Sequence, residues 1–223
     1  MTRILTQEAI TDYGRKAKRG AVSCAVAVCP RCGAEVGAGG FKRHCARRRK
    51  FLLVLATVVH EAASYLVRWK CPVCEGTFTQ YPWWAIPFKR YVLAFIESRC
   101  AAYVEDAAPT YAAGVTAQGE PFSYADADAG QELAPSTLWR WNTTLGRMRE
   151  PVRAALELIK QQEPSTGIFR ALGHLQIRAG KFRSATRKEL LRQCRERVAV
   201  ARAYRALFGV ETFPAYATGY GFG

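Results

Sequence analysis

The chain has 223 residues, of which 33 are Lys or Arg and 18 are Asp or Glu, so its formal net charge is +15 at neutral pH. A hydrophobic content of 49% and an aromatic content of 12% exclude a disordered chain and indicate one or two small globular domains. Such a positive excess predicts a polyanionic partner, because clustered Lys and Arg neutralise phosphates and release counterions. We therefore expect nucleic acid as the partner, and the helical pattern and the family resemblance described below favour double-stranded DNA.

The charge is divided unevenly along the chain. Residues 1–100 contain 17 basic and 6 acidic side chains, and residues 136–223 contain 16 basic and 6 acidic ones. The intervening residues 101–135 contain 6 acidic side chains and no basic one. The sequence thus predicts two basic lobes that flank an acidic connector.

No apolar run approaches the roughly 18–20 residues that a membrane span requires. The longest candidate, Phe51–Val59, is rich in β-branched residues and is typical of a buried strand. The first twenty residues contain Arg3, Arg15, Lys16, Lys18 and Arg19, without the apolar core of a signal peptide. We expect no membrane contact and a cytoplasmic protein, in which thiols are reduced, buried or bound to metal.

Four of the eight cysteines form a pattern, in two pairs with two-residue gaps that each begin Cys-Pro. Two such knuckles supply four thiolates at the corners of a tetrahedron, which is the arrangement of a structural zinc site. We predict one Zn²⁺ held by Cys29, Cys32, Cys71 and Cys74. A redox motif is the alternative, and Cys24, Cys45 and His44 are rival ligands.

Each knuckle and the segment between them can be assigned a local structure. Proline presets φ after the first cysteine of each pair, and Gly33 and Gly76 are expected to supply the positive φ that closes each turn. Lys50–Thr57 and Ser64–Lys70 are predicted strands, separated by a turn at residues 60–63. Residues 41–49 precede them as a basic segment.

Helical patterns follow the second knuckle. A helix is predicted over Tyr91–Val104 and another from Pro135, a residue type favoured in the first turn. In the second helix a buried stripe is expected at Leu138, Trp141, Leu145 and Met148, and Trp139 is assigned to packing. Ser136, Arg140, Thr143 and Arg147 recur on another face, as in a helix that reads the major groove. The alternative is an amphipathic helix with a solvated basic face.

Several segments together resemble a bacterial family of transposase-associated zinc-ribbon and helix-turn-helix domains. The segments that carry the resemblance are 68–74, Thr77-Phe78-Thr79, Tyr81-Pro82, 86–91 and Pro135-Ser136-Thr137-Leu138-Trp139-Arg140-Trp141. The similarity covers residues 25–147. The sequence departs from the family at Glu75, which displaces the turn glycine by one position, and at Ala134, where a capping Ser is expected.

The resemblance implies a zinc ribbon that leads into a helix-turn-helix, a bacterial nucleoid-associated location, and a separate transposase as a partner. The residues assigned to base reading are Ser136, Thr137, Arg140 and Arg147. The residues assigned to phosphate contacts are Lys42, Arg43, Arg47, Arg48, Arg49, Lys89 and Arg90, which add affinity and salt dependence without specifying sequence.

The C-terminal part is predicted to contain helices over Pro151–Gln162, Thr166–Arg178 and Thr186–Phe208, the last with a capping box at Thr186 and Glu189. It is open to three interpretations: a second DNA-binding helix pair, a dimerisation element that makes a homo-oligomer, or a docking face. The expected fold class is α+β, with a small β zinc ribbon followed by helices. The segments are a basic arm (1–22), the ribbon (23–90), the helix-turn-helix region (91–149) and the C-terminal helical region with a flexible tail (150–223).

The sequence contains no recognisable catalytic set, and the last aspartate is Asp128. We therefore expect a non-catalytic protein of a mobile element that recognises transposon-end or target-site DNA and recruits a transposase. The first alternative is a sequence-specific transcription regulator. The second is a nuclease or recombinase component that uses Asp126 and Asp128.

Overall fold

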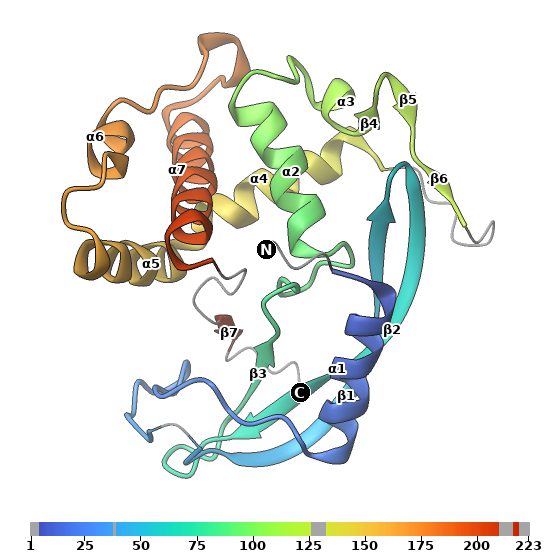
Figure 1. Cartoon of the computed structure of the whole chain (residues 1–223), viewed down its shortest axis with the longest axis vertical. Helices are drawn as coiled ribbons and strands as arrows, with labels where there is room; N and C mark the ends of the chain where they lie inside the picture. The colour runs from blue at the N-terminus through green and yellow to red at the C-terminus, as the bar shows by residue number, and fades with distance from the viewer. Residues whose placement is uncertain (1–4, 38, 126–132, 210–215, 219–223) are drawn as a thin grey trace. The chain divides into compact units, whose positions relative to one another are not determined.

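The computed structural model describes residues 5–37, 39–125, 133–209 and 216–218, and its fold class is α+β (Figure 1). The chain forms two compact units. The first, called the sheet unit here, comprises Ile4–Leu55, Val59–Leu93 and Ala215–Gly223. The second, called the helical unit, comprises Met1–Arg3, Ala56–Val58 and Ala94–Pro214.

The sheet unit is built on a long β-hairpin. Its elements are α1 (Gln7–Arg19), β1 (Lys42–Leu55), β2 (Val58–Lys70), β3 (Thr77–Tyr81) and β7 (Tyr216–Thr218). Hydrogen bonds connect the strands in the order β1-β2-β3-β7. The β2–β3 pair is antiparallel with Trp69 opposite Phe78, and the β3–β7 pair is antiparallel with Gln80 opposite Ala217.

Both strands of the hairpin are longer than the sequence predicts. The turn lies at Ala56, which adopts a positive φ of 53°, and residues 60–63 belong to β2. The predicted turn at 60–63 is therefore wrong, and the basic segment 42–49 lies inside β1. Pairing with β2 satisfies the backbone groups of this segment whatever its side chains, so apolar content underestimates the strand.

Helix α1 packs on this hairpin (Figure 1). Thr6 caps it by accepting a hydrogen bond from the amide of Ala9 at 3.2 Å, and Ile10 and Ala17 are fully buried. The absence of a side chain at Gly14 permits close approach, because a Cβ there would lie 2.8 Å from Ser64 Oγ. Residues that the sequence assigns to a basic arm thus form a helix within the sheet unit.

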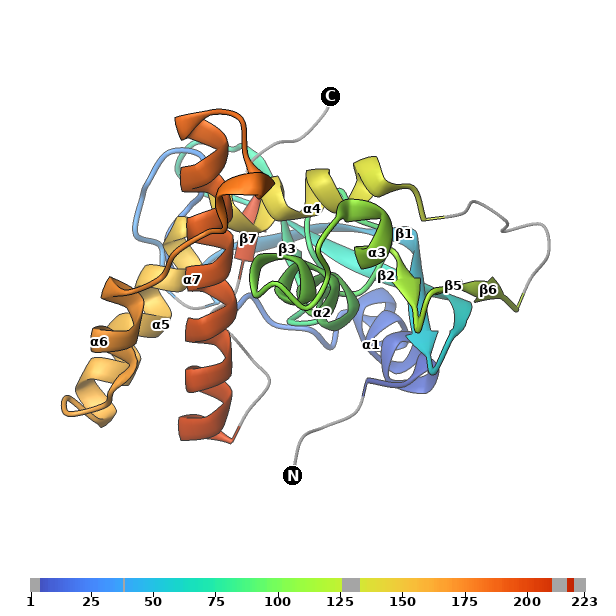
Figure 2. The same cartoon turned by 90° about the horizontal axis from the view of Figure 1, so that it is seen from above.

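The helical unit contains most of the helices. Its elements begin with α2 (Leu93–Val104), α3 (Tyr111–Gly114), β4 (Thr116–Ala117), β5 (Glu120–Pro121) and β6 (Ser123–Tyr124). They continue with α4 (Pro135–Arg147), α5 (Arg149–Gln162), α6 (Ile168–Gly173), the 3-10 turn η2 (Ala179–Lys181) and α7 (Ala185–Phe208). Helix α7 packs against α4, α5 and α6, as Figures 1 and 2 show.

The inward face of α4 is the predicted one. Leu138, Trp141 and Leu145 are buried, and Pro135 occupies the first turn. Ala134 is the N-cap residue and makes no side-chain capping bond. The helix crosses α7 closely at Gly146, where a Cβ would lie 2.4 Å from the carbonyl oxygen of Leu190.

Two predicted features of the C-terminal part are wrong. The N-cap of α7 is Ser184, whose side chain accepts from the amide of Arg187 at 3.2 Å, so Thr186 forms no capping box. The middle helix ends at Gly173 instead of Arg178, since glycine has low helix propensity.

A buried ion cluster joins α2 to α7. Arg197, with 1% of its surface exposed, donates to one carboxylate oxygen of Glu97 at 2.9 Å, and Arg205 donates to the other at 3.1 Å. Glu97 is itself buried. A charged group in this position depends on its partners, because water cannot solvate it.

We predict that Glu97→Gln lowers the free energy of unfolding by about 3–5 kcal/mol, because it leaves the buried Arg197 guanidinium without its carboxylate. Glu105→Gln is the matched control: it removes the carboxylate that pairs with Arg202, which is exposed, and we expect a loss below about 1 kcal/mol. Denaturant unfolding measures both. Equal losses in the two variants would contradict a structural role for the buried cluster.

Candidate metal centre and basic surfaces

Four thiols converge at one end of the sheet unit. The Sγ atoms of Cys29, Cys32, Cys71 and Cys74 all lie within 4.8 Å of one another. The Cys29–Cys74 and Cys32–Cys71 Sγ distances are both 3.9 Å. A tetrahedral site with metal–sulfur bonds of about 2.3 Å has sulfur–sulfur edges of about 3.8 Å. The four side chains therefore can hold a metal ion, and they fit a tetrahedral one.

Two loops present these cysteines. Cys29 and Cys32 lie in the loop between α1 and β1, and Cys71 and Cys74 lie between β2 and β3. In the first loop the amide of Gly33 donates to the carbonyl of Cys29 at 2.9 Å. In the second, the amide of Cys71 donates to the carbonyl of Gly76, also at 2.9 Å. The backbone thus forms a tight turn around each pair.

The cluster is buried on one side only. Cys29 and Cys71 are buried against a small core that includes Phe41, Trp69 and Phe78, whereas Cys32 and Cys74 are exposed. Four protein thiols complete a tetrahedron and leave no position for water or substrate, which is typical of a structural site.

The thiols differ in acidity because their surroundings differ. Backbone amides, first that of Cys74 and then that of Val73, lower the pKa of Cys71 to about 7. A hydrogen bond from the backbone of Ala34 lowers the pKa of Cys32, but burial and the neighbouring thiols outweigh it and raise this pKa to about 11. One thiolate thus forms easily, and further negative charge in the cluster requires a cation.

Both turns contain a residue with a positive φ, but the residue type differs between them. Gly33 adopts a positive φ of 72°, as the sequence predicts, but in the second turn Glu75 has the positive φ of 55°. The prediction that Gly76 supplies the positive φ of the second turn is therefore wrong. Gly76 allows the side chain of Arg31 to pass closely, because a Cβ there would lie 2.9 Å from Arg31 Cδ.

Among the described residues, no other group of three or more metal-ligating side chains comes together. The rival ligands lie apart from the cluster: the thiol of Cys24 is directed to the carbonyl of Val26 at 3.7 Å, and His44 and Cys45 lie on β1. Cys100 and Cys194 are buried in the helical unit. The four-cysteine set is thus the one that the sequence predicts.

We predict that Cys71→Ser abolishes tight metal binding and unfolds the loops around the site, because metal binding and folding are coupled in such sites. Elemental analysis of freshly purified protein measures the metal. Cys24→Ser is the control and should keep its full metal content. Full metal retention in Cys71→Ser would contradict the assignment.

We predict that Glu75→Gly stabilises the metal-bound protein by up to about 1 kcal/mol, because glycine adopts a positive φ without the cost that other residues carry. The lost ion pair with Lys70 is exposed and contributes little. Gly33→Ala should have the opposite sign. Thermal unfolding of the metal-bound variants compares their stabilities. A lower stability of Glu75→Gly than of the unmodified protein would contradict the expected gain from the backbone conformation.

The basic residues of β1 divide into two groups. Lys42, Arg47 and Arg48 are exposed and Arg49 is half-buried, and none of these four side chains makes a hydrogen bond or ion pair within the described part of the chain. Arg43 is engaged: its guanidinium donates to the carbonyls of Ala17 and Lys18 at 3.0 and 3.2 Å, at the C-terminal end of α1. The first group is available to a ligand.

The other predicted phosphate contacts lie next to the hairpin. Arg90 donates to Glu61 at 3.4 Å, and Glu61 also pairs with Lys50 at 2.8 Å. Lys89 is half-buried. These cations are therefore less available than those on β1, and sequence alone gives no indication of this difference.

The predicted base-reading residues share the outward side of α4. Ser136, Arg140 and Arg147 are exposed and Thr137 is half-buried. The element that precedes this helix is not the expected one: α3 has 4 residues and is followed by the β4–β5 pair. The helices ahead of α4 in the described residues are α2 and the four-residue α3, and the helix-turn-helix that the resemblance implies stays a prediction.

Trp139 is a site feature that the sequence assigns to packing. Its side chain is 46% exposed, and the guanidinium of Arg187 lies over its ring at 4.7 Å from the centroid. The exposed face of α4 therefore carries an aromatic ring in addition to cations. The repeat of apolar residues is the signal that could have indicated this, because Trp139 lies outside the stripe of Leu138, Trp141 and Leu145.

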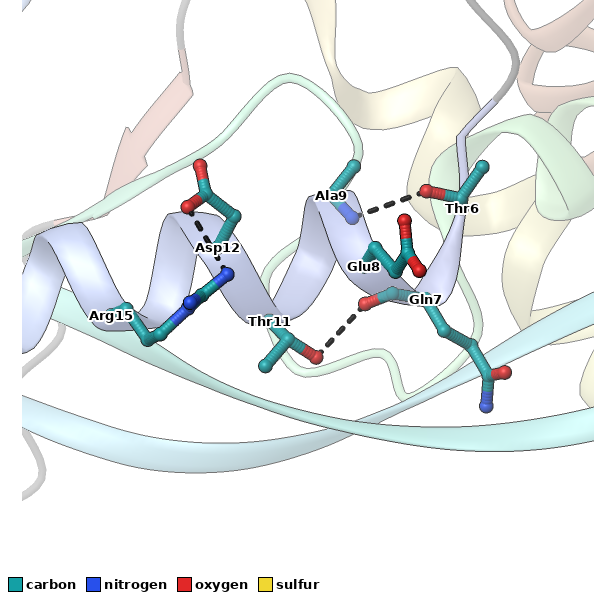
Figure 3. Close-up of a pocket in the computed structure, with 7 residues that line it drawn as sticks. All are labelled: Thr6, Gln7, Glu8, Ala9, Thr11, Asp12 and Arg15. Atoms are coloured by element: carbon teal, nitrogen blue, oxygen red, sulfur yellow. Dashed lines mark hydrogen bonds and ion pairs between the residues drawn. The ribbon is translucent and has the colours of Figure 1, made fainter.

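The pocket on α1 does not bring together side chains from different elements that could act on a ligand. It is lined by Thr6, Gln7, Glu8, Ala9, Thr11, Asp12 and Arg15, all from one helix and its cap (Figure 3). Asp12 contacts Arg15 at 3.4 Å, and its hydrogen bond with Lys16 lowers its pKa. These are local contacts of a helix surface, without a nucleophile or a base positioned by another element.

Three further findings concern the nuclease alternative, membrane spans and known proteins. Asp126 and Asp128, the proposed acids of a nuclease, lie outside the described residues. No helix in the described part of the chain is long and apolar enough to cross a membrane. No family model, curated protein or solved structure matches the chain.

Proposed function

We propose that the protein is a zinc-containing, non-catalytic protein that binds double-stranded DNA. The observation that carries the proposal is the position of unpaired cations on a strand of the same unit in which four thiols converge. A metal centre of this kind holds a small sheet rigid, and a rigid strand can present its cations to a regular polyanion.

Zinc is the metal that suits the site best. Thiolates are soft ligands, and a tetrahedral set of four is typical of structural Zn²⁺. When bound, the ion would be held by Cys29, Cys32, Cys71 and Cys74, and its charge would balance the thiolates that the cluster otherwise resists forming.

The cations of β1 suit contacts with phosphates. Side chains two residues apart on a strand lie on one face about 6.6 Å from each other, so Arg47 and Arg49 point to one side of β1 and Lys42 and Arg48 to the other. A duplex that lies against one face of β1 meets the two cations of that face, which supports affinity but not sequence preference.

Helix α4 supports the reading of bases. One side is buried against the helical unit, and the opposite side presents Arg140 and Arg147 to solvent. A guanidinium that reaches guanine O6 and N7 in the major groove contributes about 1–3 kcal/mol of discrimination.

The biological setting rests on the sequence resemblance. We infer that the DNA is a transposon end or target site and that a separate transposase is the protein partner, in a bacterial cytoplasm with association to the nucleoid. Footprinting separates this from a transcription regulator, which would protect a promoter operator. Mg²⁺-dependent cleavage abolished by Asp126→Asn would instead support a nuclease.

We predict that DNA affinity falls steeply with salt and that Arg47→Gln with Arg49→Gln, which lie on one face of β1, reduces the slope of log affinity against log salt by about 2, because two phosphate contacts are lost. Arg140→Ala should instead relax the preference at one base pair and leave the salt slope nearly unchanged. Fluorescence anisotropy with duplexes of selected and scrambled sequence measures both.

Arg153→Gln on α5 is the matched control for charge, because Arg153 is exposed and contacts only Glu150 on its own helix. It should leave both slope and preference unchanged. Affinity that is flat between low and physiological salt would contradict the proposal. A uniform loss in Arg140→Ala would assign α4 to phosphate contact and place the base reading elsewhere, for which α7 is the next candidate.

A further inference from the structure

Trp139 differs from the other tryptophans whose exposure the structure defines. Trp69, Trp84 and Trp141 are buried and Trp83 is half-buried, whereas Trp139 is 46% exposed although it lies within a helix. Its neighbour Leu138 faces the core, so the orientation of α4 itself places the indole at the surface.

Arg187 holds this indole from α7. Its guanidinium lies over the ring at 4.7 Å, and it donates to the hydroxyl of Thr143 at 2.7 Å and to the carbonyl of Trp139 at 3.4 Å. It also donates to the hydroxyl of Tyr111, whose ring stacks on Tyr103 at 4.1 Å with an interplanar angle of 19°. Contacts with α3 and α4 thus hold the guanidinium of Arg187, which lies over the ring of Trp139.

The surroundings of the ring are positive. Helix α4 contains no acidic residue, and Ser136 and Arg140 are exposed on it. From α7 the cation that reaches the ring is Arg187, whereas the ammonium of the exposed Lys188 lies over the ring of Phe182 at 5.6 Å. A fixed aromatic ring among cations and a hydroxyl is the combination that binds a nucleotide through base stacking and phosphate contact.

We propose that Trp139 stacks on an unpaired nucleobase of the bound DNA and that Arg187 is the positioning residue for the indole. The proposal rests on the function proposed above and deepens it, because it adds a preference for DNA in which a base is unpaired. The faces of paired bases are covered by their neighbours in a duplex, whereas a flat ring can cover the face of a base that has left the stack.

The probes are two duplexes of one sequence, one intact and one with a single 2-aminopurine that has no partner base. We expect the protein to bind the second about 5- to 150-fold more tightly, which corresponds to the ~1–3 kcal/mol of one stacked base, and to quench the 2-aminopurine fluorescence. Trp139→Ala should lose this preference and the quenching while it keeps its affinity for the intact duplex. Trp139→Phe should retain most of both.

Leu158→Ala is the control for an exposed apolar side chain of the same unit, and it should behave as the unmodified protein. Arg187→Gln should weaken the quenching without changing the affinity for intact DNA, a result that a merely structural role would not produce. Circular dichroism checks that each variant is folded.

Three results would overturn the proposal. Equal affinity of the unmodified protein for both duplexes would show that no base is captured. An equal loss of affinity for both duplexes in Trp139→Ala would show that the indole contacts a groove of the duplex and does not stack on an unpaired base. Failure to bind either duplex would overturn the proposed function together with this inference.

Discussion

The convergence of four thiols from two loops is the constraint on which the proposed metal centre depends. Cys29, Cys32, Cys71 and Cys74 converge to within 4.8 Å, and their loops are closed by backbone hydrogen bonds. The pKa of Cys71 is lowered to about 7 and that of Cys32 is raised to about 11, so the first thiol ionises more readily than the second. Thiolates this close together repel one another, and a bound cation would offset that repulsion and connect the loop after α1 with the turn that joins β2 to β3.

The helical unit depends on side-chain contacts made by arginines of its longest helix. Its longest helix, α7, is connected to α2 through the buried Glu97–Arg197 pair and to α4 through Arg187, which contacts Thr143 and Trp139. Both contacts use arginines of a helix whose sequence suggests a basic DNA-binding face. A substantial part of the C-terminal positive charge therefore serves the fold, and net charge alone overstates the surface available to DNA.

Much of the metal site could be predicted from the sequence, and less of the rest. The doubled Cys-Pro-x-Cys pattern identifies all four ligands because a two-residue gap has few geometries. The inward stripe of α4 follows from its period of 3.6 residues. The turn of the hairpin could not be located, because Ala56 adopts a left-handed conformation that no glycine or asparagine signals.

The roles of individual arginines could not be predicted from the sequence either. Arg43 binds the end of α1, while Arg47, four residues along the same strand, is unpaired in the described structure. Only tertiary contacts separate the two. For Trp139 and Trp141, two residues apart on α4, the helical period does separate the exposed ring from the buried one.

The most direct measurement is a chelator titration of the full chain in which metal content and affinity for duplex DNA are followed together. If the thiol centre holds the sheet that presents the β1 cations, one zinc ion per chain should be lost, and DNA affinity should fall in step with it and return when Zn²⁺ is restored. Unchanged affinity after complete removal of the metal, or fresh protein that contains no zinc, would contradict the link between the centre and DNA binding.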